Sequence, residues 1–224
     1  MGKLLLIGFF FIVYLGFSQD EIVYETDDFS EIKVFDAITV NLLRSFENKV
    51  VVYGEDKEKV TVVNSNGRLK IRMQIDKLYG GNKTYVDVHY SKFLDLIDVN
   101  EGAFISSSQV FQQTYVKLRS QEGGEIDLEL QVDKLDAKVV SGGKIEVSGK
   151  ALTQEVEARS GGEYEAVKLE NEQAKINVIA GGFAYVTTSE YIEAKVKMGG
   201  TIKIYGNPRV LEETIFLGGN ILKM

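Results

Sequence analysis

The chain has 224 residues, of which 44% are hydrophobic and 26% are charged, and this composition is that of a folded protein rather than a disordered one. Its formal net charge of −7 argues against nucleic acid as a partner, because binding to phosphate backbones depends on clustered lysine and arginine. Cysteine is absent, which excludes disulfides, thiolate catalysis, zinc–cysteine sites and the acylated cysteine of a bacterial lipoprotein.

Residues 1–18 have the pattern of an export signal. Lys3 is the only charged residue before Asp20, and a continuous apolar run from Leu4 to Gly16 follows it. This run is too short to span a bilayer comfortably, so we expect no membrane span in the mature chain. The pattern predicts cleavage near residue 18, a linker over residues 19–27, and a protein exported to the periplasm, the cell surface or the medium.

Residues 28–98 predict a β-rich section. Asn66-Gly67 is a strong signal for a tight turn between a strand that includes residues 60–63 and a strand at 68–74. A second turn at Gly80-Gly81 precedes a strand expected at 84–90. We expect this section to form irregular coils that cap the first end of the domain.

Residues 99–222 repeat a glycine pair at nearly constant intervals. The steps between pairs are 18 to 20 residues, and a weaker member, Asn100-Glu101-Gly102, precedes them. A fixed period of this length is typical of a solenoid. The paired glycines are Gly123 and Gly124, Gly142 and Gly143, Gly161 and Gly162, Gly181 and Gly182, Gly199 and Gly200, and Gly218 and Gly219.

Apolar residues occupy the same places around each pair, and polar residues alternate with them, as in half-buried strands. The pattern predicts coils of strand, Gly-Gly corner and strand, stacked as a parallel β-helix in which Ile126 lies over Ile145. Glycine suits such a corner because φ can be positive there and a Cβ atom could crowd the next coil. Strands rather than helices follow the pairs, so we reject a phosphate-binding loop.

Several phrases of the sequence occur together in a fixed order. They are FSEIKVFDAITVNLL at 29–43, NKVVVYGEDKEKVTVVNSNGRLKI at 48–71, LDLIDVNEGAFI at 94–105, the Gly-Gly repeats, and IKIYGNP at 202–208. In this order they resemble the head GIN domain family, described as "putative auto-transporter adhesins" and common in Bacteroidetes-type bacteria. The resemblance covers residues 28–222 as one domain. It implies a signal peptide, a β-helix-like all-β fold and no established enzymatic activity.

Phe183 and Tyr185 are the main candidates for a binding surface. They take outward positions that are charged in the preceding coils, with Tyr191 expected nearby and with Glu165 and Lys203 beside them. Exposed aromatic side chains could stack on a sugar ring or contact a partner protein. The alternative is that a loop or the N-terminal section covers them.

An acidic column is a weak candidate for a cation site. Asp127, Glu146 and Glu165 fall at the same outward position of three successive coils, where a hard cation such as Ca²⁺ would relieve their repulsion. A flat strand face, however, offers poor geometry for the six or more oxygen ligands that calcium prefers.

His89, the only histidine, shares a strand face with Asp87 and Tyr85, but no third ligand is evident. We therefore expect a surface histidine and no metal or other cofactor. A basic stripe on the strand at 68–74 indicates an ordinary solvated face. Its members are Arg68, Lys70 and Arg72.

These features favour an exported, non-enzymatic, adhesin-like module that binds a glycan, an envelope polymer or a protein. A polysaccharide-active β-helix enzyme is the alternative, but the nearly uniform coils leave no long loops to wall a catalytic groove. A third possibility is a structural or assembly role in the envelope, with homo-oligomers formed through the open end of the β-helix at Ile221–Leu222.

Overall fold

The computed structural model describes residues 20–74 and 81–224. The predicted signal peptide at 1–18 and Gly80 lie outside these residues. Within the described ranges the chain is almost entirely β-strand, with two short 3-10 helices, η1 (Lys57–Lys59) and η3 (Gly81–Lys83). No helix in these ranges is long and apolar enough to cross a membrane.

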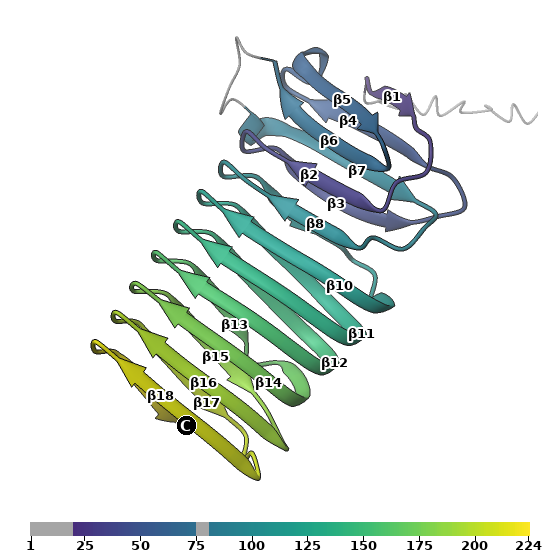
Figure 1. Ribbon diagram of the computed structural model, residues 1–224. Coiled ribbons are helices and arrows are strands. Elements are labelled where there is room, and N and C mark those ends of the chain that lie inside the picture. Colours follow the sequence, from purple (N-terminus) through teal and green to yellow (C-terminus); the bar gives the residue numbers. More distant parts are fainter. Residues whose placement is uncertain (1–19, 75–80) are drawn as a thin grey trace, which may run out of the picture.

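The strands stack as a parallel solenoid of about seven turns, spaced about 19 residues apart (Figure 1). Two walls of parallel strands face each other, which confirms the predicted β-helix. The first wall contains β8 (Leu96–Val99), β10 (Phe111–Gln121), the second halves of β11 (Glu125–Val140) and β12 (Lys144–Arg159), β14 (Leu169–Ile179), β16 (Tyr191–Lys197) and β18 (Val210–Phe216). The second wall contains β9 (Phe104–Ser106), the first halves of β11 and β12, β13 (Glu163–Ala166), β15 (Phe183–Thr187), β17 (Thr201–Tyr205) and β19 (Asn220–Lys223).

The N-terminal section places one coil out of sequence order. β2 (Glu31–Val34) pairs in parallel with both β6 (Arg68–Met73) and β8. In the same way, β3 (Thr39–Arg44) pairs with both β7 (Thr84–Tyr90) and β9. The coil made by β2 and β3 therefore lies between the coil of β6 and β7 and the coil of β8 and β9.

Antiparallel strands extend both walls at this end. β5 (Val60–Ser65) pairs with β6 through the predicted turn at Asn66-Gly67, where both φ angles are positive. β4 (Lys49–Gly54) pairs with β7, and β1 (Ile22–Glu25) pairs with β4. The expectation of a linker over residues 19–27 is thus wrong for β1, because its backbone is bonded into the sheet.

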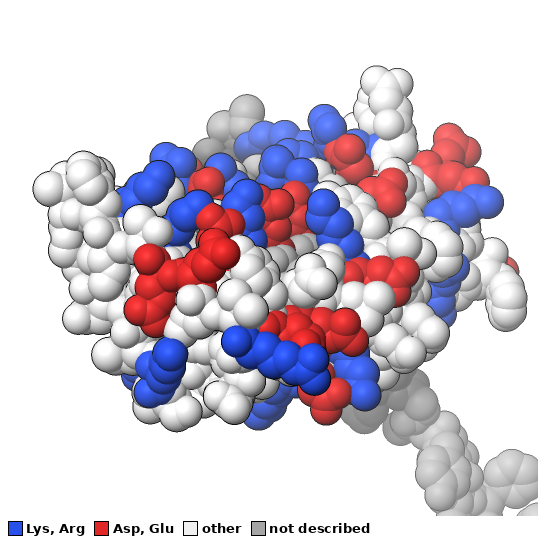
Figure 2. Space-filling view, turned by 60° about the horizontal axis from the view of Figure 1, so that its bottom comes forward, with Lys and Arg blue, Asp and Glu red and all other residues white. Residues whose placement is uncertain are grey.

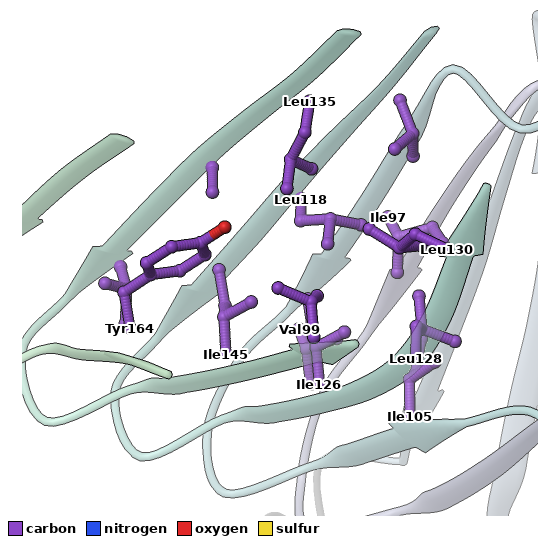
Figure 3. Packing of buried hydrophobic residues seen from close by; sticks show 14 of the residues in the cluster. Ile97, Val99, Ile105, Leu118, Ile126, Leu128, Leu130, Leu135, Ile145 and Tyr164 are labelled. Atoms are coloured by element: carbon purple, nitrogen blue, oxygen red, sulfur yellow. The ribbon is translucent and has the colours of Figure 1, made fainter. Parts of the chain in front are cut away.

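The interior consists of columns, by which we mean side chains in register in successive coils. Ile126 lies in register with Ile145, as predicted, and Ile145 with Tyr164 (Figure 3). The three side chains are buried, and each fully buried side chain of this size stabilises the fold by about 1.5–3 kcal/mol. Because every second side chain of each strand points inward, the inward side chains of all coils together form one continuous core.

The glycine pairs form the corners along one edge of the stack (Figure 1). At the corner 159–162 the backbone N–H of Gly162 donates to the carbonyl oxygen of Arg159 at 3.0 Å. Ser160 and Gly161 have φ angles of 51° and 76°, as in a type I′ turn. A Cβ atom on Gly162 would lie 2.5 Å from the carbonyl oxygen of Val139 in the coil below. The first glycine is therefore required by its φ angle and the second by the spacing between coils.

Candidate ligand-binding groove and outer surfaces

A groove of about 1180 Å³ runs along the edge of the stack opposite the glycine corners. It is formed where each strand of the second wall connects to the first wall of the next coil. Seven successive connections contribute to it, around residues 90–93, 110–114, 131–133, 150–152, 170–172, 187–189 and 206–207. Because neighbouring strands are about 4.8 Å apart, six such steps make the groove roughly 29 Å long.

Buried amide side chains hold these connections in place. Nδ2 of Asn171 donates to the carbonyl oxygens of Ala151 at 3.1 Å and Leu152 at 3.2 Å, while Oδ1 accepts from Thr188 at 3.3 Å. Gln113 exchanges hydrogen bonds with the backbone of Leu94 in a similar way. These amides replace strand pairing where the chain turns, so they satisfy backbone groups that would otherwise be buried without partners.

The lining of the groove mixes neutral polar, charged and apolar side chains, and Val110 and Leu152 are about half exposed within it. Gln112, Thr114, Gln131 and Asn207 supply amides and a hydroxyl group. Nζ of Lys150 lies 3.0 Å from Oε2 of Glu170, and both side chains are largely exposed. Asp133 and Glu172 also line the groove. Such a lining offers many hydrogen-bond donors and acceptors spread along its length.

Aromatic side chains gather at the N-terminal end of the groove. Phe93 is 56% exposed, whereas Tyr90 and Phe111 are buried, with ring centroids 6.3 Å apart. The guanidinium carbon of Arg44 lies 5.1 Å from the ring centroid of Phe93 and 5.4 Å from that of Tyr90. Burial is the main reason why the pKa of Tyr90 is raised, and the Arg44 charge opposes this shift. This end therefore combines an exposed ring with a cation.

The structure brings four of the five sequence-predicted binding residues together on the outer face of the second wall. Phe183, 38% exposed, lies on β15 with Tyr185. Glu165, Tyr185 and Lys203 are in register in successive coils, and Nζ of Lys203 lies 5.3 Å from the Tyr185 ring centroid. Burial, followed by the charges of Glu163 and Glu165, raises the pKa of Tyr185.

The expectation that Tyr191 lies beside this aromatic pair is wrong. The connection at residues 188–190 carries the chain into the first wall, where Tyr191 begins β16 in register with Gln173 and Val210. There it interacts with Glu212, and its pKa is raised by desolvation first and then by this carboxylate. Sequence proximity is misleading here because a coil turns back at this edge.

The side chain of Lys144 forms ion pairs with the predicted acidic column. Asp127, Glu146 and Glu165 are in register, as predicted. Nζ of Lys144, from the adjacent outward column, lies 3.1 Å from Oε2 of Glu146 and 3.5 Å from Oε2 of Glu165. The hydrogen bond to Glu146 is the main cause that raises the pKa of Lys144. This lysine relieves part of the repulsion within the column.

The lone histidine shares the outward face of β7 with Tyr85 and Asp87. Oδ1 of Asp87 accepts a hydrogen bond of 3.1 Å from Asn41. In residues 20–74 and 81–224, no three histidine or acidic side chains are grouped so as to hold a metal ion.

The basic stripe on β6 contacts neighbouring coils rather than an open site. Nε of Arg68 donates to Oε2 of Glu31, and Nζ of Lys70 lies 4.9 Å from the ring centroid of Phe35. Figure 2 shows that positive and negative side chains are interleaved over the face it presents. The surface seen there has no broad patch of one sign.

Fold and groove together define the class of protein: an all-β parallel solenoid with a long groove on one edge. The chain belongs to the family described as "Putative auto-transporter adhesin, head GIN domain", whose model matches residues 28–208. None of the curated proteins matches the chain.

Solved structures confirm the fold. A putative adhesin from Bacteroides fragilis superposes with a TM-score of 0.83 at 18% identity, covering 91% of this chain and 96% of that one. A putative lipid binding protein from Parabacteroides distasonis has a TM-score of 0.71 at 18% identity, covering 92% and 96%. A putative adhesin from Parabacteroides merdae has a TM-score of 0.68 at 16% identity, covering 91% and 95%. At these identities the likeness concerns the fold alone.

The sequence reasoning missed the groove. Its residues share no motif, and they become neighbours only when the coils are stacked. One signal was available: the segments Gln131–Asp133 and Lys150–Leu152 stand seven to nine residues after their glycine pairs, so aligning the repeats would have placed them side by side.

Proposed function

We propose that this protein is an exported, non-enzymatic, adhesin-like module that binds an extended glycan of the cell envelope or of the surroundings along its groove. The observation that carries the proposal is the groove itself, which spans seven connections and is lined by amides and hydroxyl groups together with exposed apolar side chains, among them the aromatic ring of Phe93. A polymer with regularly spaced hydroxyl groups can use such a lining over its whole length, whereas a small ligand would use only part of it. Membership of an adhesin family supports this proposal.

The structure offers two surfaces for the same role, and they can be compared directly. The groove exposes Phe93, and the second wall exposes Phe183 beside Tyr185. We favour the groove because it is concave and long, while the second-wall patch is part of a flat sheet. Concave sites bury more of a ligand and desolvate more of its hydrogen bonds.

A glycan array followed by titration of the best oligosaccharide series tests the proposal. We expect affinity to rise with chain length until the groove of roughly 29 Å is filled. Phe93→Ala is expected to weaken binding about tenfold, a loss of about 1.4 kcal/mol. Phe183→Ala/Tyr185→Ala serves as the matched control and is expected to leave affinity within about twofold.

Three results would count against the proposal. Loss of binding only in the Phe183/Tyr185 variant would move the site to the second wall. Binding of phospholipid vesicles without any glycan binding would indicate a lipid ligand, as in the description of the P. distasonis neighbour. Measured turnover of any polysaccharide would contradict the non-enzymatic assignment and favour the alternative, a polysaccharide-active enzyme.

The last coil supports a second candidate function, assembly through its end. Ile215 takes an inward position in register with Val196, yet Ile215 is 50% exposed while Val196 is buried. None of the residues described here covers β18 on its outer side. A dimer would be seen by analytical ultracentrifugation and would be lost in Ile215→Lys. A monomer at all concentrations would exclude this candidate.

A further inference from the structure

We infer that Arg44 and Phe93 form a subsite at one end of the groove for a negatively charged sugar that terminates an otherwise neutral glycan chain. The inference rests on the proposed function, because it assigns the ligand class of the same groove. It adds a direction to the binding, since only one end of the groove would take the charged sugar.

The guanidinium group of Arg44 is held in a defined position. Arg44 is the last residue of β3, and its Nη1 donates to the carbonyl oxygen of Lys92 at 2.8 Å. Its backbone N–H donates to Oε1 of Gln109 at 2.7 Å. The rings of Tyr90 and Phe93 lie at 5.4 and 5.1 Å from the guanidinium carbon. These contacts fix the group without neutralising it.

No ion pair joins Arg44 to a carboxylate anywhere in the described ranges, although the protein has a surplus of acidic residues. A guanidinium group has five N–H donors in a planar fork, and the hydrogen bond to Lys92 uses one. The remaining edge suits a carboxylate or a sulfate, which such a fork binds through two parallel hydrogen bonds.

Phe93 supplies the second part of the subsite. Its ring is more than half exposed and lies beside the cation, inside the lining of the groove. An aromatic face of this kind can pack against the C–H face of a sugar ring. One sugar residue can therefore contact the ring with its apolar face and the guanidinium group with its anionic substituent.

Charge along the groove limits the anionic sugar to this end. Farther along, Asp133 and Glu172 line the groove, and the cation of Lys150 is already paired with Glu170 at 3.0 Å. A polymer with a negative charge on every sugar would meet these carboxylates and be repelled. A neutral chain with one charged end would be attracted at Arg44 and would avoid repulsion elsewhere.

Matched glycan pairs test the inference in the full mature protein. The probes are lacto-N-neotetraose and its singly sialylated and singly sulfated forms, xylotetraose with and without one terminal glucuronic acid, and polygalacturonate. We expect at least one charged-end form to bind roughly tenfold more tightly than its neutral partner and than polygalacturonate, because charge-assisted hydrogen bonds are strong. The sialylated and sulfated arms distinguish a carboxylate from a sulfate.

Variants of Arg44 identify the residue responsible. Arg44→Gln is expected to abolish the preference, measured as the ratio of the affinities for the charged-end and neutral forms, and Arg44→Lys is expected to retain part of this ratio. Arg159→Gln, at the edge of the glycine corners, is the control and should leave the affinities for both members of each glycan pair unchanged. Thermal melting confirms that each variant is folded.

The outcomes separate this inference from the proposed function. Equal binding of both members of every pair, or a preference that survives in Arg44→Gln, would overturn the subsite while leaving the groove as a glycan site. Absence of any glycan binding by the wild type would overturn both.

Discussion

The hydroxyl group of Tyr164 donates a hydrogen bond of 2.7 Å to Oε1 of Gln154 inside the solenoid (Figure 3 shows the ring pointing inward). Tyr164 comes from the second wall and Gln154 from the first, so this bond crosses the core. Both residues occupy positions that are apolar in most other coils, and both are buried. The two side chains therefore depend on each other.

Removal of the Tyr164 hydroxyl group should destabilise the fold. Tyr164→Phe leaves Oε1 of Gln154 buried without a partner, in addition to its Nε2, which already has none. We expect a loss of about 1–3 kcal/mol in the free energy of unfolding, measured by chemical denaturation. Adding Gln154→Leu should recover most of the loss, since the polar group is then gone. A double variant that is less stable than Tyr164→Phe would contradict this account.

Tyr164 should also make the protein sensitive to alkali. Burial raises the pKa of Tyr164 far above its ordinary value of about 10. Below pH 10 the hydroxyl group is neutral in both states and its contribution to stability is complete. As the pH rises above 10, only the unfolded state loses the proton, so stability falls. We expect a steeper fall between pH 9.5 and roughly 11.5 for the wild type than for Tyr164→Phe. Parallel stability curves for the two proteins over this pH range would contradict this account.

The two glycines of one corner should respond differently to alanine. Gly161 has a φ of +76° and open space around its Cα atom, so Gly161→Ala costs only the backbone strain of about 1–2 kcal/mol. Gly162→Ala places a Cβ atom 2.5 Å from a carbonyl oxygen of the neighbouring coil, so we expect a loss above about 3 kcal/mol. Urea unfolding of the two variants measures the difference. Equal losses would show that coil spacing adapts easily.

Replacement of Lys144 should reverse the effect of salt on the stability of the protein. In Lys144→Gln the carboxylates of Glu146 and Glu165 lose the cation between them, and Asp127 stands in the same column. We expect a loss of up to about 1 kcal/mol at low ionic strength, because the side chains are partly exposed. Sodium chloride should stabilise the variant by screening the repulsion, whereas it should leave the wild type unchanged or weaken it slightly. Melting temperatures from 20 to 500 mM salt would show this, and parallel curves would exclude a role for Lys144.

Much of the solenoid was predictable, because its information is local and repeated. Ile126, Ile145 and Tyr164 are recognised as inward residues from their offset to a glycine pair alone. Less local features were not predictable. The residue before each glycine pair, such as Ser160, has a positive φ angle. Its residue type does not predict this conformation, since serine, glutamate, alanine, methionine and leucine all occur at this position. Tyr191 was misplaced because an offset along the chain does not show at which residue the wall changes.

The sequence by itself determined the period of the coils, the inward face of each strand and the corner at each glycine pair, because these depend on alternation and on glycine geometry. Only the tertiary structure decided that β2 and β3 lie between coils that follow them in the chain. Only the tertiary structure brought Arg44 to Phe93 and aligned seven unlike connections into one groove. The physical reason is that these contacts join residues of different coils, whose meeting depends on which strand edges pair rather than on the residues nearby in sequence.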